Sequence, residues 1–144
     1  MRQRSQRALA GMPTILDDII SLWFSYAFRA KHPEIVKQAS DMLLAGDPVV
    51  HSWTWEAMLE LNYGLYLIRL PMPVMALTGS EDRSVSLAAF QALIDTLPHP
   101  KSLIFSGAGH LPLLETPKDY ARVLDEFAAA ASKDTRKQQE RSLK

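Results

Sequence analysis

Apolar residues recur at helical spacing along the first half of the chain. The spacing predicts amphipathic helices over 14–30, 33–46 and 47–61. Pro13 agrees with the first of these bounds because proline is tolerated in a first helical turn. Gly46 agrees with the second because glycine accepts the left-handed conformation at a helix end. Three short helices are therefore predicted in a row.

The period of the pattern changes after Pro71. Residues 73–78 form a continuous apolar run, which suits a strand buried on both faces of a parallel sheet. Residues 101–106 form a second short apolar strand, and helical spacing returns over 86–97 and 117–131. The second half is therefore predicted as strand, helix, strand, helix, and the chain belongs to the α/β class.

Both ends of the chain are polar. Residues 1–13 carry arginine but no acid and are interpreted as an N-terminal connector, with an organelle transit peptide as the less favoured alternative. Residues 132–144 lack core residues and predict a frayed helix end or a disordered tail. Between these ends, a shift in composition separates a helical region, 14–70, from an α/β region, 71–131.

The composition is that of one globular domain. The chain has 144 residues, 47% of them apolar, and its formal charge is zero, so nothing in the charge points to nucleic acid or an anionic membrane as a partner. Charged residues interrupt every apolar stretch, so no membrane span is expected. There is no cysteine, which excludes disulfides and a cysteine nucleophile and leaves cytoplasm as the default location. No His, Asp and Glu set has metal-ligand spacing, and no cofactor is expected.

An acid and a histidine follow the two predicted strands. Asp82 lies in the sequence Gly79-Ser-Glu-Asp, and His110 follows the second strand in Gly-Ala-Gly-His. Parallel sheets place their sites outside the carboxyl ends of the strands, so these two side chains should emerge side by side. Either residue alone is most simply a surface or structural group, and the pairing reverses that interpretation. Glu81 is the rival acid, but the spacing from Gly79 favours Asp82.

These two loops resemble those of the α/β-hydrolase superfamily, whose members carry G-x-x-D after the seventh strand and G-H-x-x-x-x-E-x-P after the eighth. Matched by position, the resemblance implies that Asp82 is the acid and His110 the histidine of a catalytic triad, with Glu115 and Pro117 at the start of the last helix. It covers 16–131. It implies the C-terminal part of an α/β-hydrolase fold, in which three cap helices precede a small parallel sheet.

The nucleophile of such a triad is not found in the sequence. A serine hydrolase presents its serine on a G-x-S-x-G elbow, and no such segment occurs in the 144 residues. Four serines lie near the acid or the histidine, and each is most simply a loop or cap hydroxyl: Ser80, Ser84, Ser86 and Ser106. The resemblance therefore implies that residues outside this chain supply the nucleophile, and little turnover is expected without them.

The helical segment containing Trp23-Phe24 is similar to that of 3-oxoadipate enol-lactonases and related ester or lactone hydrolases. Haloalkane dehalogenases, epoxide hydrolases and carbon–carbon bond hydrolases share the same framework, so the reaction stays open. The residues predicted to contact a small ester or lactone substrate are Trp23, Phe24, Val85 and Leu111. His51, Trp53 and Trp55 are weaker candidates, because aromatic residues at helical spacing more often form core.

The competing interpretation is a non-catalytic binding or interaction domain. In the family the seventh strand pairs with a sixth, which is missing, so the edge of 73–78 is expected to be exposed. The chain is therefore expected to be marginally folded, to self-associate through that edge, or to need an N-terminal partner. Whether it is a fragment, a truncated gene model or a standalone protein stays open at this point.

Overall fold

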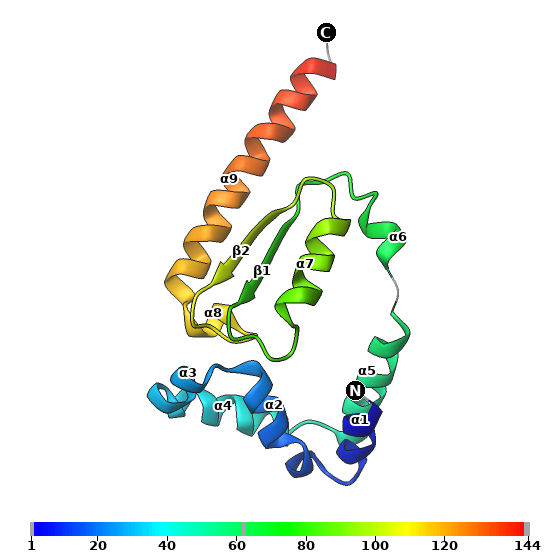
Figure 1. Cartoon of the computed structure of the whole chain (residues 1–144), viewed down its shortest axis with the longest axis vertical. Coiled ribbons are helices and arrows are strands. Elements are labelled where there is room, and N and C mark those ends of the chain that lie inside the picture. The colour runs from blue at the N-terminus through cyan, green and yellow to red at the C-terminus, as the bar shows by residue number, and fades with distance from the viewer. Residues whose placement is uncertain (1, 62, 143–144) are drawn as a thin grey trace.

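The computed structural model describes residues 2–61 and 63–142 (Figure 1). In chain order the elements are α1 (Arg2–Leu9), the 3-10 turn η1 (Met12–Thr14), α2 (Leu16–Trp23), α3 (Tyr26–Lys31), α4 (Pro33–Leu44), α5 (Pro48–Glu60), α6 (Gly64–Leu67), β1 (Met75–Gly79), α7 (Leu87–Thr96), β2 (Lys101–Phe105), α8 (Pro112–Glu115) and α9 (Pro117–Ser142). The predicted elements that correspond to α4, α5, β1, α7 and β2 are confirmed to within two residues at each end.

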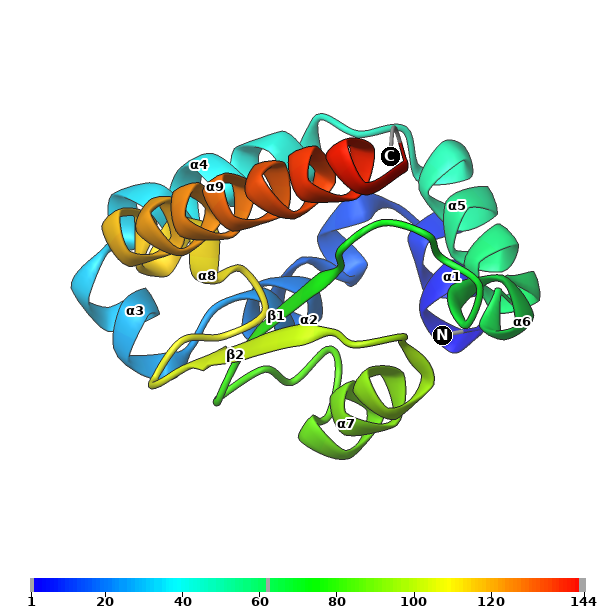
Figure 2. The ribbon, with the colours of Figure 1, turned by 90° about the horizontal axis from the view of Figure 1, so that it is seen from above.

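The strands β1 and β2 are parallel neighbours, with Gly79 opposite Phe105 where both strands end. Helix α7 connects them, and α7 and α9 lie on opposite sides of the sheet (Figure 2). Phe105 forms a buried cluster on one side with Ala108 and with Val123 of α9. Within the described residues each strand has a partner on one side only, so each leaves one edge unpaired.

Burial of the strands is uneven. Ala76, Thr78 and Gly79 of β1 are buried, and Met75 and Leu77 are half-buried. The prediction of a strand buried on both faces is therefore only partly met. In β2, Leu103 and Ile104 remain exposed, so this small sheet leaves apolar surface uncovered.

The single helix predicted over 14–30 is wrong, because the chain turns between α2 and α3. Phe24 is extended, with φ −115° and ψ 140°, and the next residue, Ser25, is the N-cap of α3. The Ser25 hydroxyl accepts a hydrogen bond from the Phe28 N–H at 3.2 Å. Serine is favoured at caps because its side chain satisfies an N–H that has no partner in the helix, and hydrophobic spacing alone does not register such a break.

The segment predicted as an N-terminal connector contains α1, which packs against α5. The hydroxyl oxygens of two fully buried serines, Ser5 of α1 and Ser52 of α5, lie 2.7 Å apart. Ser5 also donates to the carboxylate of Glu56 at 3.0 Å. Helices this short are marginal alone, so α1 depends on packing that local sequence does not reveal.

At the other end, α9 continues to Ser142, beyond the predicted bound of 131. Lysine, arginine, glutamine and glutamate are good helix formers, and neither glycine nor proline follows within the helix. Whether 132–144 is disordered stays untested, and residues 143 and 144 lie outside the described ranges.

Two apolar clusters hold the helical region together. One joins Ala8, Met12, Ile15 and Ile19, and the other joins Ile20, Phe24 and Phe28 and contacts Leu111. Since Leu111 follows β2, the helical region packs directly on the loop that carries the histidine. In the described part of the chain, no helix has both the length and the apolar character needed to cross a membrane.

Candidate active site

Asp82 lies in the loop after β1, with its carboxylate held by four hydrogen bonds. Oδ1 accepts the N–H groups of Ser84 at 2.8 Å and Val85 at 2.9 Å. Oδ2 bonds the hydroxyl of Thr78 at 2.9 Å and Nδ1 of His110 at 2.9 Å. Only 3% of the Asp82 side chain is exposed, so the carboxylate is fixed and largely screened from water.

The pKa of Asp82 reflects two opposing effects. Burial is the largest single influence and favours the neutral acid, which raises the pKa. The hydrogen bonds from His110, Val85, Thr78 and Ser84 favour the charged form, and together they outweigh burial. The pKa of Asp82 is therefore lower than its usual value, and the residue is a carboxylate at neutral pH.

His110 completes the pair from the loop after β2. A carboxylate only accepts hydrogen bonds, so Nδ1 of His110 must carry a proton, and in the uncharged tautomer with this proton Nε2 is the basic nitrogen. The side chain is 33% exposed, and Nε2 has no hydrogen-bond partner within the described residues. This arrangement of acid and imidazole is the one that a catalytic triad requires.

The two loops are joined to each other through backbone contacts at Gly79. The N–H groups of Ser80 and Glu81 donate to the carbonyls of Phe105 and Ala108, both at 2.9 Å. A Cβ at Gly79 would lie 2.0 Å from the Ala108 oxygen, which no side chain could tolerate. Glycine is therefore required here for the acid loop to approach the histidine loop, which explains its place in the G-x-x-D pattern.

The four residues predicted to contact substrate occupy different environments. Phe24 is 1% exposed and stacks on Phe28 in the helical core. Trp23 and Leu111 are half-buried against the same cluster and are joined by a hydrogen bond from the Leu111 N–H to the Trp23 carbonyl at 3.2 Å. Val85 is exposed beside Asp82. Their contact with substrate stays a prediction, with Phe24 now seen to be mainly a core residue.

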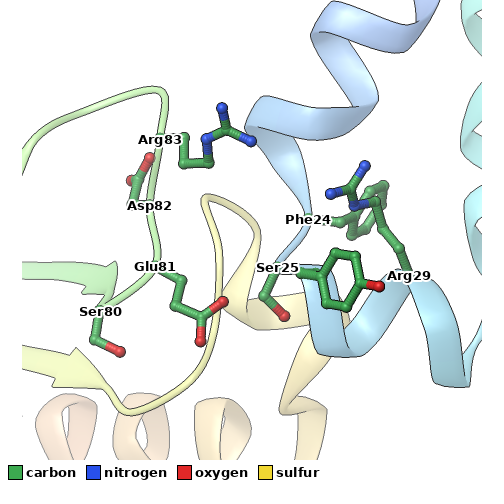
Figure 3. Close-up of a pocket in the computed structure, with 8 residues that line it drawn as sticks. Phe24, Ser25, Arg29, Ser80, Glu81, Asp82 and Arg83 are labelled. Carbon is green, nitrogen blue, oxygen red and sulfur yellow. The ribbon is translucent and has the colours of Figure 1, made fainter.

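Asp82 lines two hollows. One, of about 370 Å³, lies between the acid loop, 80–83, and the start of α3, and is lined by Phe24, Ser25 and Arg29 (Figure 3). The other, of about 350 Å³, is lined by both Asp82 and His110 and by apolar residues of β1, α7 and the chain before β1. The second hollow is the one that opens onto the imidazole.

The remaining candidates take structural roles. The Ser80 hydroxyl accepts the Gly107 N–H at 2.8 Å, and Ser86 caps α7. Nε2 of His51 accepts a hydrogen bond from Trp55 at 2.7 Å, and burial lowers the pKa of this histidine. Glu81 is exposed and makes no side-chain hydrogen bond to His110 among the described residues. Within the same ranges no group of three or more His, Asp or Glu side chains is placed to hold a metal ion.

Sequence reasoning missed two contacts at this site. Thr78 was taken only as the end of a strand, although its hydroxyl bonds Asp82. Glu115 was taken only as the start of the last helix, although its carboxylate bonds Ser25 and Gly109. Its fixed spacing from His110 in the G-H-x-x-x-x-E-x-P pattern was the available signal.

Taken together, the sheet, the cap helices and the paired loops are the C-terminal portion of an α/β-hydrolase fold. No family model matches the sequence. The chain is 26% identical over 115 residues to 3-oxoadipate enol-lactonase 2 of Acinetobacter baylyi, which covers 80% of this chain and 43% of that protein.

Two solved structures have the same fold. A thermophilic esterase from Thermogutta terrifontis matches with a TM-score of 0.81 and 22% identity, over 90% of this chain and 49% of the esterase. The enol-lactonase from Burkholderia xenovorans LB400 matches with a TM-score of 0.83 and 16% identity, over 88% of this chain and 49% of that enzyme. The chain thus spans a little under half the length of the proteins it matches, and the predicted α/β-hydrolase fold is confirmed.

Proposed function

We propose that this chain supplies the acid and the general base of a hydrolase acting on carboxylic esters or lactones, with Asp82 and His110 in those roles. The nucleophile and the oxyanion donors come from a polypeptide segment outside the 144 residues, because these contain no G-x-S-x-G elbow. The observation that carries the proposal is the 2.9 Å hydrogen bond from His110 to the buried Asp82. The likeness to an enol-lactonase and an esterase supports the substrate class.

The chemistry follows from the protonation of the pair. A serine hydroxyl is a poor nucleophile, so Nε2 of His110 takes its proton as the serine oxygen attacks the acyl carbon. The resulting imidazolium is stabilised by the Asp82 carboxylate and returns the proton to the departing alkoxide. Water then repeats the two steps, which releases the carboxylic acid and restores the serine.

The open side of the sheet supports a completing segment at this site. The hollow lined by Asp82 and His110 also contains Val74, Met75 and Phe90, so apolar surface and catalytic candidates share one face. The β1 edge beside it is unpaired in the described residues. A polypeptide that added a strand there would cover the apolar face and approach the imidazole together.

A fluorophosphonate probe tests the proposal, since it labels only serines that a base has activated. The tagged chain would be recovered from its own cells with any polypeptide bound to it. We expect label on a co-purifying segment that contains G-x-S-x-G, with the label lost in His110→Ala. His99→Asn is the matched control, because His99 is exposed and has φ 51°, a conformation that asparagine also tolerates.

The chain alone gives the second test. Losing the nucleophile of a serine hydrolase costs on the order of 10⁶ in rate, so the purified chain should hydrolyse a p-nitrophenyl ester only at the background rate. Clear hydrolysis that His110→Ala abolishes would mean that the nucleophile lies within these residues. That result would overturn the proposed division of the site.

The alternative is a non-catalytic interaction domain, which the exposed apolar surface of α5 favours. Trp53 is 65% exposed, and Val50 and Met58 of the same helix are also exposed. A co-purifying protein that lacks G-x-S-x-G and takes no probe would support this alternative. In both cases we expect a cytoplasmic protein.

A further inference from the structure

Both residues that flank His110 are tied to the cap segment Trp23–Ser25. On one side, the Leu111 N–H donates to the Trp23 carbonyl at 3.2 Å. On the other side, the Gly109 N–H donates to Oε1 of Glu115 at 3.0 Å. The imidazole is therefore carried by a short loop whose two sides are both anchored outside the sheet.

The Glu115 carboxylate makes the second of these connections a bridge. Its Oε1 also accepts the Ser25 N–H at 2.9 Å, and its Oε2 accepts the Ser25 hydroxyl at 2.6 Å. One side chain thus joins the histidine loop to the N-cap of α3, over 90 residues of sequence. A carboxylate with three donors at such distances is a stiff link, because each bond is charge-assisted.

The close packing at Gly109 leaves no room for a side chain. A Cβ added there would lie 2.7 Å from the Ser25 nitrogen, 2.8 Å from the Trp23 oxygen and 2.8 Å from Oε1 of Glu115. The backbone before His110 is therefore in direct contact with the cap segment. A shift of the start of α3 must move this backbone or break the hydrogen bonds that join the two.

We propose that Glu115 is a positioning residue that couples the cap to His110, so that the imidazole meets Asp82 only while the cap segment is seated on the histidine loop. This rests on the proposed function for its catalytic meaning. The simpler possibility is that Glu115 only stabilises the fold. That possibility predicts lower stability with an unchanged imidazole, whereas positioning predicts a changed imidazole in a folded chain.

Two variants of Glu115 distinguish the effect of side-chain length from the effect of side-chain charge. Glu115→Gln keeps the length: its amide oxygen can accept from Gly109 and Ser25, and its amide nitrogen can donate to the Ser25 hydroxyl. Glu115→Asp keeps the charge but is one methylene shorter, so it cannot reach both partners. Asp119→Asn is the matched control, since Asp119 is an exposed carboxylate of the next helix that pairs with Arg122.

The measurement is proton and nitrogen NMR of the full chain labelled in histidine, which reports the tautomer of His110 and its hydrogen-bonded Nδ1 proton directly. We expect the native chain, Glu115→Gln and Asp119→Asn to keep a downfield Nδ1 proton. Glu115→Asp should lose that proton and show mixed tautomers, with its helical circular dichroism retained.

A folded Glu115→Asp chain with an unchanged Nδ1 proton would overturn the proposal, as would loss of that proton in Glu115→Gln but not in Glu115→Asp. If Glu115→Asp does not fold, Ser25→Ala replaces it, because this variant keeps the backbone bond from Ser25 to Glu115, removes the hydroxyl bonds to Glu115 and to the Phe28 N–H, and should broaden the same signal. An unchanged signal in Ser25→Ala would then count against coupling. The readout needs no turnover, so failure of the proposed hydrolysis is recorded separately by the probe assay.

Discussion

Substituting Asp82 by asparagine should destabilise the chain in a manner that depends on pH. The carbonyl oxygen of the new side chain can still accept the N–H groups of Ser84 and Val85. Its amide group, however, faces Thr78 and Nδ1 of His110 in place of the Oδ2 atom that bonds both. The Thr78 hydroxyl can turn to accept from the new amide, so its bond persists without the charge. The charge-assisted bond to His110 is lost. At net values of roughly 1.5–3 kcal/mol for each such bond, we expect a loss of about 2–4 kcal/mol near neutral pH.

The pH dependence follows from the lowered pKa of Asp82. A carboxyl whose folded pKa lies below its usual value of 3.8 stabilises the fold above that value, and this contribution is lost as pH falls through the folded pKa. Asparagine cannot ionise. The difference in free energy of unfolding between the native chain and Asp82→Asn should therefore be full at neutral pH and should shrink in strong acid.

Urea unfolding followed by circular dichroism at several pH values gives this difference directly. Taking the difference between two chains cancels the titration of the other acids. Asp95→Asn is the matched control, because Asp95 is exposed on α7 and accepts a hydrogen bond only from Gln91 within the described residues. The reasoning would be refuted by a difference that stays constant from about pH 7 down to about pH 3, or by the same pH-dependent loss in the control.

Three further predictions concern the loops, the helical region and the sheet edge. Gly79→Ala should destabilise the chain by more than Gly107→Ala in thermal melts. The new methyl group at 79 meets the Ala108 carbonyl, whereas at 107 it meets open space and costs only about 1–2 kcal/mol for its positive φ; equal losses would contradict the close approach. Ser5→Ala should cost about 1–3 kcal/mol, because it leaves the buried Ser52 hydroxyl without its partner. Ser52→Ala should cost less, because the Ser5 hydroxyl keeps its bond to Glu56, and the double variant should cost less than the sum of the two. Strict additivity in urea melts would argue against their contact. The mean mass in sedimentation velocity should rise with concentration, because the β1 edge is free to pair with another chain; a monomer throughout would contradict this.

The elements that sequence predicted well carry their own start and stop signals. Helix α4 begins at a proline, α5 begins after the capping Asp47, and both strands are short apolar runs between glycine or proline. Such signals act locally, so a pattern in sequence is enough to recover them. The pairing of Asp82 with His110 was predictable for a related reason, since neighbouring parallel strands deliver their following loops to one edge.

The features that sequence did not reveal depend on partners far along the chain. Ser25 breaks the first predicted helix and bonds Glu115, which is 90 residues away. Helix α1 is held by Ser52, which lies 47 residues from Ser5. Phe24 borders one hollow but is mainly a core residue, because the chain turns at Ser25 and its side chain packs in the helical cluster. Tertiary contacts of this kind override local helix propensity and produce no periodic pattern of apolar residues in the sequence.

The close approach at Gly79 has a consequence for the order in which an active site would be assembled. Asp82 and His110 are only 28 residues apart, and their loops are joined by backbone hydrogen bonds and held by contacts that all lie within this chain. The imidazole is therefore oriented by contacts within this chain alone. If two polypeptides form the enzyme, encounter between them would limit the onset of hydrolysis, and activity would appear with second-order kinetics in the two chains. A slow first-order phase would instead point to rearrangement of the pair after binding.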